Sequence, residues 1–242
     1  MTSMELCHKP GLFRRGPVDG NGIADMLRAT QRIMIYGDNK ILKIPFSGKL
    51  VKIETLISGN TCGARHWSDG KAEYPMFPER LWLRVHPDGR ELFWLDECET
   101  IARENPAKKP GKHANVPFSE TPNLDDYRRA LESAIFGNEE EERYIRTHFW
   151  WTANDPVRHH QPDAQLPGDF RENLMKLQTM LNPAEPNDRI TASEIARELG
   201  DFDAAIRLLD FPFPRKLSYY VRKFKEWSGE KDTSVREMRD DR

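Results

Sequence analysis

The chain has 242 residues, enough for one large or two small domains, and 38% of them are hydrophobic. This content supports a sizeable core and excludes a disordered chain. The 37 basic and 39 acidic residues leave a net charge of −2. Because no overall basic field results, we expect neither a membrane partner nor nucleic acid as the main partner.

The cysteines indicate a reducing compartment. Cys7, Cys62 and Cys98 are odd in number and widely spaced, and none forms a Cys-x-x-Cys pair, so a disulfide framework is not expected. The first residues show no long apolar run after a basic start, and no apolar stretch approaches the ~20 residues that span a bilayer. We therefore expect a cytoplasmic protein.

Residues 1–104 are expected to form a small antiparallel part. A short amphipathic helix is predicted at 23–27. Short β-rich runs between turn signals then predict a meander and, around Pro87–Gly89, a hairpin. These runs are 32–36, 40–46, 49–57, 81–86 and 91–95. We expect one sheet of four or five strands, followed by a short helix at 96–102.

The second half is expected to be all helical. Residues 105–118 are basic and rich in breakers, and predict a linker. Apolar residues then recur at helical spacing over 119–229, and the charged tail 230–242 is expected to fray. The expected helices cover 122–136, 139–151, 169–181, 191–199, 202–210 and 217–229. The predicted fold class is therefore α+β.

The segment Gly200–Ile206 resembles the middle of a tetratricopeptide repeat, in which a glycine turns the chain between two helices. Ser193 and Ala196 are small residues where such helices approach closely. The resemblance covers about one repeat, 189–210, and implies a helix-turn-helix unit. A stable solenoid needs about three repeats, and no second copy recurs at a fixed period.

The stretch Thr61–Glu97 resembles an uncharacterised class of bacterial proteins, in which a Trp-Ser-Asp-Gly loop precedes a zinc-ribbon knuckle and an aromatic strand. His86 and Gly89 stand at the knuckle positions that hold cysteines in that class. Trp150–Asp155 is similar to a further helix of the class. The resemblance implies a hairpin that has kept the knuckle shape and lost its zinc ion. It implies no activity, since the class has no assigned function.

A second hypothesis is an enzyme with its site in the 58–70 loop. Cys62, His66 and Asp69 share this loop, and a cysteine nucleophile needs a histidine base that a third group orients. Catalytic groups generally converge from distant segments, so we expect no catalytic site here. Zinc favours closely spaced cysteine and histidine pairs. The cysteines with His8, His66 and His86 could converge in principle, but we expect no metal and no cofactor.

A third hypothesis is a zinc-ribbon-derived protein that binds nucleic acid. Basic residues accompany aromatic ones near the C-terminus, a combination that can bind phosphate and stack on bases. They are Arg215, Lys216, Tyr219, Tyr220, Arg222, Lys223 and Lys225. We interpret this face as an ordinary charged helix surface, so nucleic acid is not the expected partner.

The preferred hypothesis is a non-enzymatic protein that binds another protein, such as an adaptor, accessory or immunity-type protein. Six tryptophans and twelve phenylalanines are more large anchors than one core needs. Aromatic residues cover more than one face of the helix at 139–151, and part of that surplus suits an interface. The expected interface residues are Trp150, Trp151 and Arg146 on this helix, and Arg65 and Trp67 in the loop. A small-molecule ligand is not specified.

Overall fold

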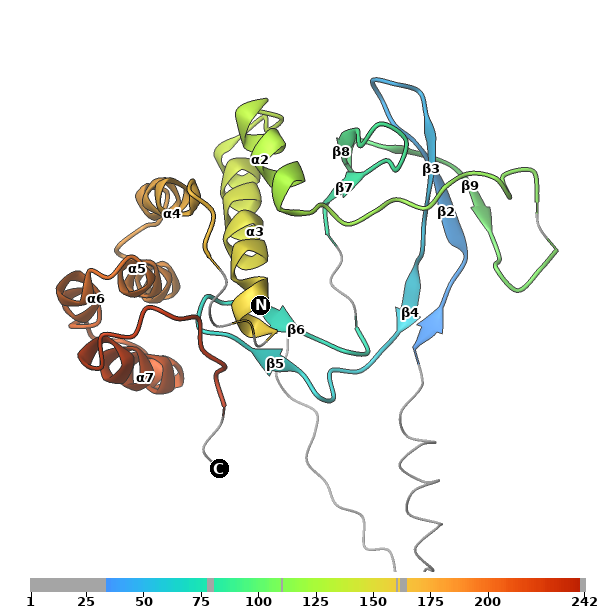
Figure 1. Cartoon of the computed structure of the whole chain (residues 1–242). Helices are drawn as coiled ribbons and strands as arrows, with labels where there is room; N and C mark the ends of the chain where they lie inside the picture. Colours follow the sequence, from blue (N-terminus) through green and yellow to red (C-terminus); the bar gives the residue numbers. More distant parts are fainter. Residues whose placement is uncertain (1–33, 78–80, 110, 160, 162–164, 240–242) are drawn as a thin grey trace, which may run out of the picture.

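The computed structural model describes residues 34–77, 81–109, 111–159, 161 and 165–239. Short antiparallel strands form the N-terminal part and helices form the C-terminal part, which confirms the α+β fold class (Figure 1). The helix expected at 23–27 and the Cys7–His8 pair lie outside the described residues. Among the described helices, none is long and apolar enough to cross a membrane.

The largest sheet has three strands in the order β3-β2-β9, all antiparallel. Its strands are β2 (Asn39–Lys43), β3 (Leu50–Ile53) and β9 (Glu99–Glu104). The helix expected at 96–102 is wrong, because this segment pairs with β2 and completes the sheet. Hydrogen bonding to the free edge of β2 outweighs the local helix signals after Asp96.

The remaining strands form three two-stranded sheets, so the prediction of one sheet is wrong. They are β1 (Ile35–Tyr36) with β4 (Leu56–Ser58), β5 (Arg65–His66) with β6 (Ala72–Glu73), and β7 (Leu83–Val85) with β8 (Leu92–Trp94). The meander expected over 32–57 is wrong, because only β2 and β3 pair as consecutive strands, whereas β1 pairs with β4. Gly37 lies between β1 and β2, where its N–H donates to the Thr55 carbonyl.

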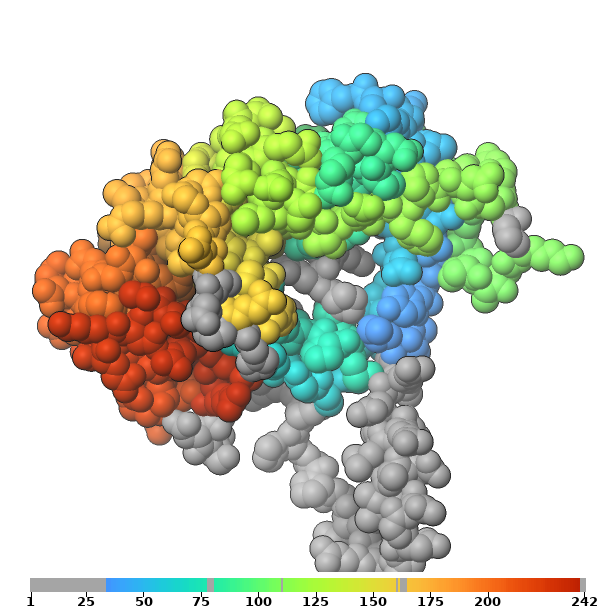
Figure 2. Space-filling model, viewed as in Figure 1, coloured from blue at the N-terminus to red at the C-terminus, as the bar shows by residue number. Residues whose placement is uncertain are grey.

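The hairpin β7–β8 joins the sheet to the helices. Successive side chains of a strand point to opposite faces, and Phe93 and Trp94 of β8 do so. Phe93 packs with Leu42 and Val51 of the three-stranded sheet. Trp94 packs in the helical core, with its indole N–H on the Ile135 carbonyl at 2.8 Å. In Figure 2 helix and hairpin regions form one continuous surface on the visible face.

Six α-helices and one 3-10 turn follow among the described residues of the C-terminal half. They are α2 (Leu124–Glu132), α3 (Glu139–Arg158), α4 (Phe170–Thr179), α5 (Pro186–Glu198), α6 (Phe202–Leu208), η1 (Arg215–Leu217) and α7 (Ser218–Gly229). The expected end of α3 near residue 151 is wrong, because the helix continues through Pro156 to Arg158. The Arg158 guanidinium donates to the Trp151 carbonyl at 2.6 Å and so holds this last turn in place.

The helix-turn-helix expected at 189–210 is present as α5 and α6. Gly200 has φ +81°, which a glycine adopts without strain. Its N–H donates to the Arg197 carbonyl, and the Asp201 N–H donates to the Ala196 carbonyl, so α5 ends in a Schellman motif. The Ser193 hydroxyl donates to the Ala205 carbonyl at 3.0 Å, which brings the helices close together.

The segments expected as a linker and a frayed tail are both anchored. Phe118 bridges to Lys52 of β3, and the His113 ring lies 2.9 Å from the Glu104 carboxylate. At the other end, Val235 is buried, and Glu237 pairs with Trp67 in an antiparallel bridge. The prediction that the tail frays is wrong for the described residues up to 239, because their backbone satisfies polar groups of the loop and of α5.

Candidate functional site

Two of the expected interface residues on α3 are used inside the protein. Trp150 is 0% exposed, and its indole N–H donates to the Glu198 carboxylate at 2.8 Å. Arg146 pairs with Glu142 and contacts Asn173 of α4. The expectation that Trp150 contacts a partner is wrong, because its ring fills the helical core.

The expected interface in the 65–69 loop is covered by the C-terminal segment. Arg65 donates to both carboxylate oxygens of Glu237 at 3.1 and 3.2 Å, and its guanidinium lies 4.6 Å from the centre of the Trp67 ring. Trp67 is only 6% exposed, so it does not offer a ring to a partner. Trp151 is partly exposed, and its indole N–H donates to the Asp69 carbonyl at 2.9 Å.

Cys62, His66 and Asp69 do not form a catalytic trio. Asp69 accepts hydrogen bonds from Asn154 and Arg158, so its carboxylate is not available to orient His66. Cys62 is exposed in the preceding turn. Within the part of the chain that the structure describes, no hydrogen bond joins these three side chains. The 58–70 loop therefore gives no geometric support to nucleophilic catalysis.

Asp69 belongs instead to a buried polar network at the end of α3. Its partners Asn154 and Arg158 are buried with it, and Asn154 also donates to Glu198. Burial lowers the pKa of Arg158 to about 9. Burial and the neighbouring Glu194 raise the pKa of Glu198 to about 8, although hydrogen bonds from Trp150 and Asn154 oppose this. The network fixes the loop on the helix.

The ligand atoms of Glu73, Asp155 and His159 lie within 4.8 Å of one another, a spacing that could hold a metal ion. Asp155 already binds the Lys71 ammonium at 2.5 Å and the Arg158 guanidinium at 2.8 Å. Two cations therefore already compensate the Asp155 carboxylate at its Oδ1 oxygen. His86 also serves the structure, because its ring contacts the Leu50 carbonyl and accepts from the Asp88 N–H.

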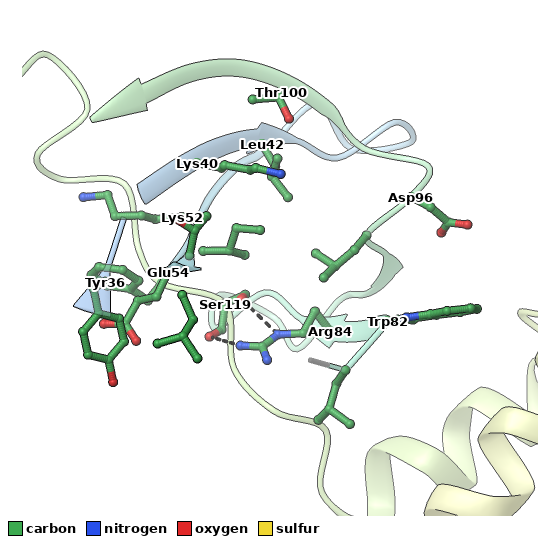
Figure 3. Close-up of a pocket in the computed structure, with 16 residues that line it drawn as sticks. Tyr36, Lys40, Leu42, Lys52, Glu54, Trp82, Arg84, Asp96, Thr100 and Ser119 are labelled. Carbon is green, nitrogen blue, oxygen red and sulfur yellow. Dashed lines mark hydrogen bonds between the residues drawn. The ribbon is translucent and has the colours of Figure 1, made fainter. Parts of the chain in front are cut away.

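The site that the structure offers is a pocket of about 620 Å³ between the three-stranded sheet and the hairpin, here called the first pocket (Figure 3). Tyr36 and Trp82 lie at its opposite ends, and Arg84 lies between them. Its volume is in the range of ligand-binding clefts. Its lining includes Leu42, Ile53, Leu56, Leu81 and Leu95, with Lys40, Lys52, Glu54, Asp96, Thr100, Phe118 and Ser119.

Arg84 provides the main polar group of the first pocket. Its Nε donates to the Ser119 hydroxyl at 3.1 Å, and its Nη2 donates to the Ser119 carbonyl at 2.9 Å. Guanidinium has five N–H donors, so these two bonds leave three for a ligand. Arg84 forms no ion pair with any described residue, and burial lowers its pKa. A partly buried cation held in this way suits a carboxylate or carbonyl oxygen.

Three exposed aromatic rings stand around the first pocket. Tyr36 is 45% exposed, Trp82 is 53% exposed and Phe118 is 47% exposed. Trp82 is held in place, because its backbone N–H donates to the Tyr144 hydroxyl and its ring stacks on the Tyr144 ring. The sequence does not reveal these residues as a set, because they come from a strand end, a hairpin and the expected linker. The aromatic surplus was the only signal for them.

Comparisons with family models, with curated proteins and with solved structures find no match. The resemblances to the tetratricopeptide repeat and to the zinc-ribbon class therefore stay predictions.

Proposed function

We propose that this chain is a non-enzymatic cytoplasmic protein that binds another protein, as an adaptor, accessory or immunity-type protein. The binding surface is the first pocket with its three aromatic rings. The observation that carries this proposal is that three exposed aromatic residues, Tyr36, Trp82 and Phe118, line the same pocket as Arg84.

The composition of this surface favours a protein partner. Aromatic residues and arginine are enriched at the centres of protein interfaces. The rings extend the apolar surface beyond the pocket itself, whereas a small-molecule site encloses most of its ligand. Exposed apolar surface of this kind marks interaction sites. The three remaining donors of Arg84 would bind a carboxylate or a main-chain carbonyl of the partner.

The test is quantitative capture of partners from the native host on immobilised protein. Arg84→Gln and Phe118→Ala should each reduce the yield of a specific partner at least ~10-fold, as expected for interface anchors worth more than about 1.4 kcal/mol. Phe46→Ala is the matched control, because Phe46 is 90% exposed at the β2–β3 turn and does not line the pocket.

Equal capture by all three variants and the unchanged protein would contradict the proposal. Loss of capture with Phe46→Ala alone would place the interface at the β2–β3 turn instead. Tight binding of a small metabolite that Arg84→Gln abolishes, with no protein captured, would replace the proposal by a small-molecule site.

A further inference from the structure

A second pocket of about 470 Å³ adjoins the first, here called the second pocket. The two share Trp82 and Asp96 in their linings. In Figure 3 the Trp82 ring extends away from Arg84 toward the helices, so it forms the wall between the two pockets. A ligand segment that covers Trp82 would therefore reach both.

The second pocket is walled by aromatic rings in a fixed arrangement. Trp82, Trp94, Tyr144 and Trp151 all line it. Trp82 and Tyr144 stack with ring centres 6.0 Å apart at 13°, and Trp94 lies 5.6 Å from Tyr144 at 59°. The hydrogen bond from the Trp82 N–H to the Tyr144 hydroxyl, at 3.0 Å, ties the hairpin to α3. These rings are thus positioned before any ligand arrives.

The charged groups of this pocket are mainly acidic. Asp96, Glu140 and Glu141 line it, and none of them forms an ion pair with a described residue. The Glu141 carboxylate accepts hydrogen bonds from the Gly137 N–H at 2.6 Å and the Asn138 amide at 2.8 Å, so Asp96 and Glu140 are the two carboxylates available to a ligand. The basic lining residues are Arg143 and His148, and Arg143 is compensated by Asp188, which accepts from its guanidinium at 2.6 and 3.2 Å. The start of α3 accounts for some acidic charge, because helix N-termini favour carboxylates. Asp96 lies after β8, so it is not part of the helix that carries Glu140 and Glu141.

We propose that the second pocket binds a cationic side chain, lysine or arginine, of the protein partner. A cation within about 6 Å of an aromatic ring centre is attracted to the face of the ring, most strongly for tryptophan. The carboxylates of Asp96 and Glu140 attract the same charge. The protein origin of the side chain rests on the proposed function, whereas the cation preference of the pocket does not.

The test is titration of the whole chain with Nα-acetyl-lysine methylamide, followed by the NMR signals of the tryptophan indole N–H groups. The signals of Trp82, Trp94 and Trp151 should shift and saturate at millimolar concentration. The neutral norleucine analogue should bind at least ~10-fold more weakly. The arginine analogue distinguishes the two side chains, and saturation by either cation supports the proposal.

Two variants locate the effect. Trp82→Ala should weaken binding at least ~5-fold, and Glu140→Gln about 2- to 5-fold at low salt. Glu139→Gln is the matched control, because Glu139 lies in the same helical turn and does not line the pocket. Arg84→Gln should leave the affinity unchanged, so failure of the first pocket is distinguishable from failure of the second.

Three results would overturn the inference. The first is equal binding of the norleucine and lysine compounds. The second is the absence of saturable shifts with either cation. The third is that tetramethylammonium binds at least ~100-fold more tightly than both side-chain compounds. That result would assign the pocket to a small quaternary ammonium ligand.

Discussion

Arg158 and Asp69 form an ion pair in which both side chains are fully buried. Taking a single charge out of such a pair leaves the other desolvated and uncompensated. Arg158 further holds the Trp151 carbonyl and Asp155, so three contacts meet at one guanidinium. The same network places the 58–70 loop on α3.

Arg158→Met should lower the free energy of unfolding by about 3–5 kcal/mol, because Asp69 stays buried without a cation. Urea unfolding measures the change. The double variant Asp69→Asn with Arg158→Met removes both charges and should recover part of the loss. A single variant as stable as the unchanged protein would show that the pair contributes nothing to the fold.

Glu198 gives the stability a pH dependence. Its carboxyl keeps the proton to about pH 8 in the fold, whereas the unfolded carboxyl releases it near its ordinary value of 4.5. The unfolded state therefore binds fewer protons between these values, and the free energy of unfolding falls as the pH rises from 4.5 to about 8.

Glu198→Gln mimics the protonated carboxyl and should remove this fall. Between pH 5 and 9 the free energy of unfolding of the unchanged protein should fall by a few kcal/mol more than that of the variant, since one pK unit corresponds to about 1.4 kcal/mol. Urea titrations at fixed pH values compare the two profiles. Parallel profiles would show that Glu198 titrates normally in the fold.

Among the elements, the α5–α6 turn depends on one glycine. Gly200→Ala should lower the free energy of unfolding by about 1 kcal/mol, because a Cβ is strained at positive φ even where space is free. Gly168→Ala is the matched control, since its Cβ would also meet open space and its φ is not in the left-handed region. Equal thermal shifts of the two variants would argue against a conformational role for Gly200.

Periodicity predicted most helices and the hairpin, but it did not locate their ends. α5 begins at Pro186, five residues before the expected Thr191, because a proline is favoured in the first helical turn. α3 passes Pro156, because contacts of Arg158 hold the last turn. β9 replaces a helix because β2 offers a partner strand. For β9 the deciding partner is distant in the sequence.

The candidate site was harder to predict, for the same reason. Trp150 and Trp82 are both tryptophans in apolar surroundings, and the sequence does not show which one is buried. Glu198, 48 residues away, binds the indole of Trp150 and fixes it in the core. Tyr144 fixes Trp82 outside it. The aromatic surplus was a useful signal, but its location needed the fold.

At the scale of the whole molecule, the C-terminal segment closes the structure. The Arg197 guanidinium donates to the Asp232 and Ser234 carbonyls, and Glu237 binds Arg65. Ending the chain after Lys231 should lower the free energy of unfolding by about 3 kcal/mol or more, because Arg197 loses two charge-assisted hydrogen bonds.

Thermal unfolding followed by tryptophan fluorescence measures this loss, since Trp67 becomes uncovered. Arg239→Ala is the control, because the Arg239 side chain is 78% exposed. This variant should leave the unfolding midpoint nearly unchanged. An unaltered midpoint after truncation would mean that residues 232–238 do not support the fold.

The whole account depends on a protein partner at the first pocket, and photo-cross-linking in the native host tests this most directly. A benzophenone amino acid at position 118 should cross-link one specific protein, whereas the same residue at position 46 should not. Addition of Arg84→Gln should remove most of the product formed at position 118. The same products from both positions, or a product at 118 that Arg84→Gln leaves unchanged, would contradict the account.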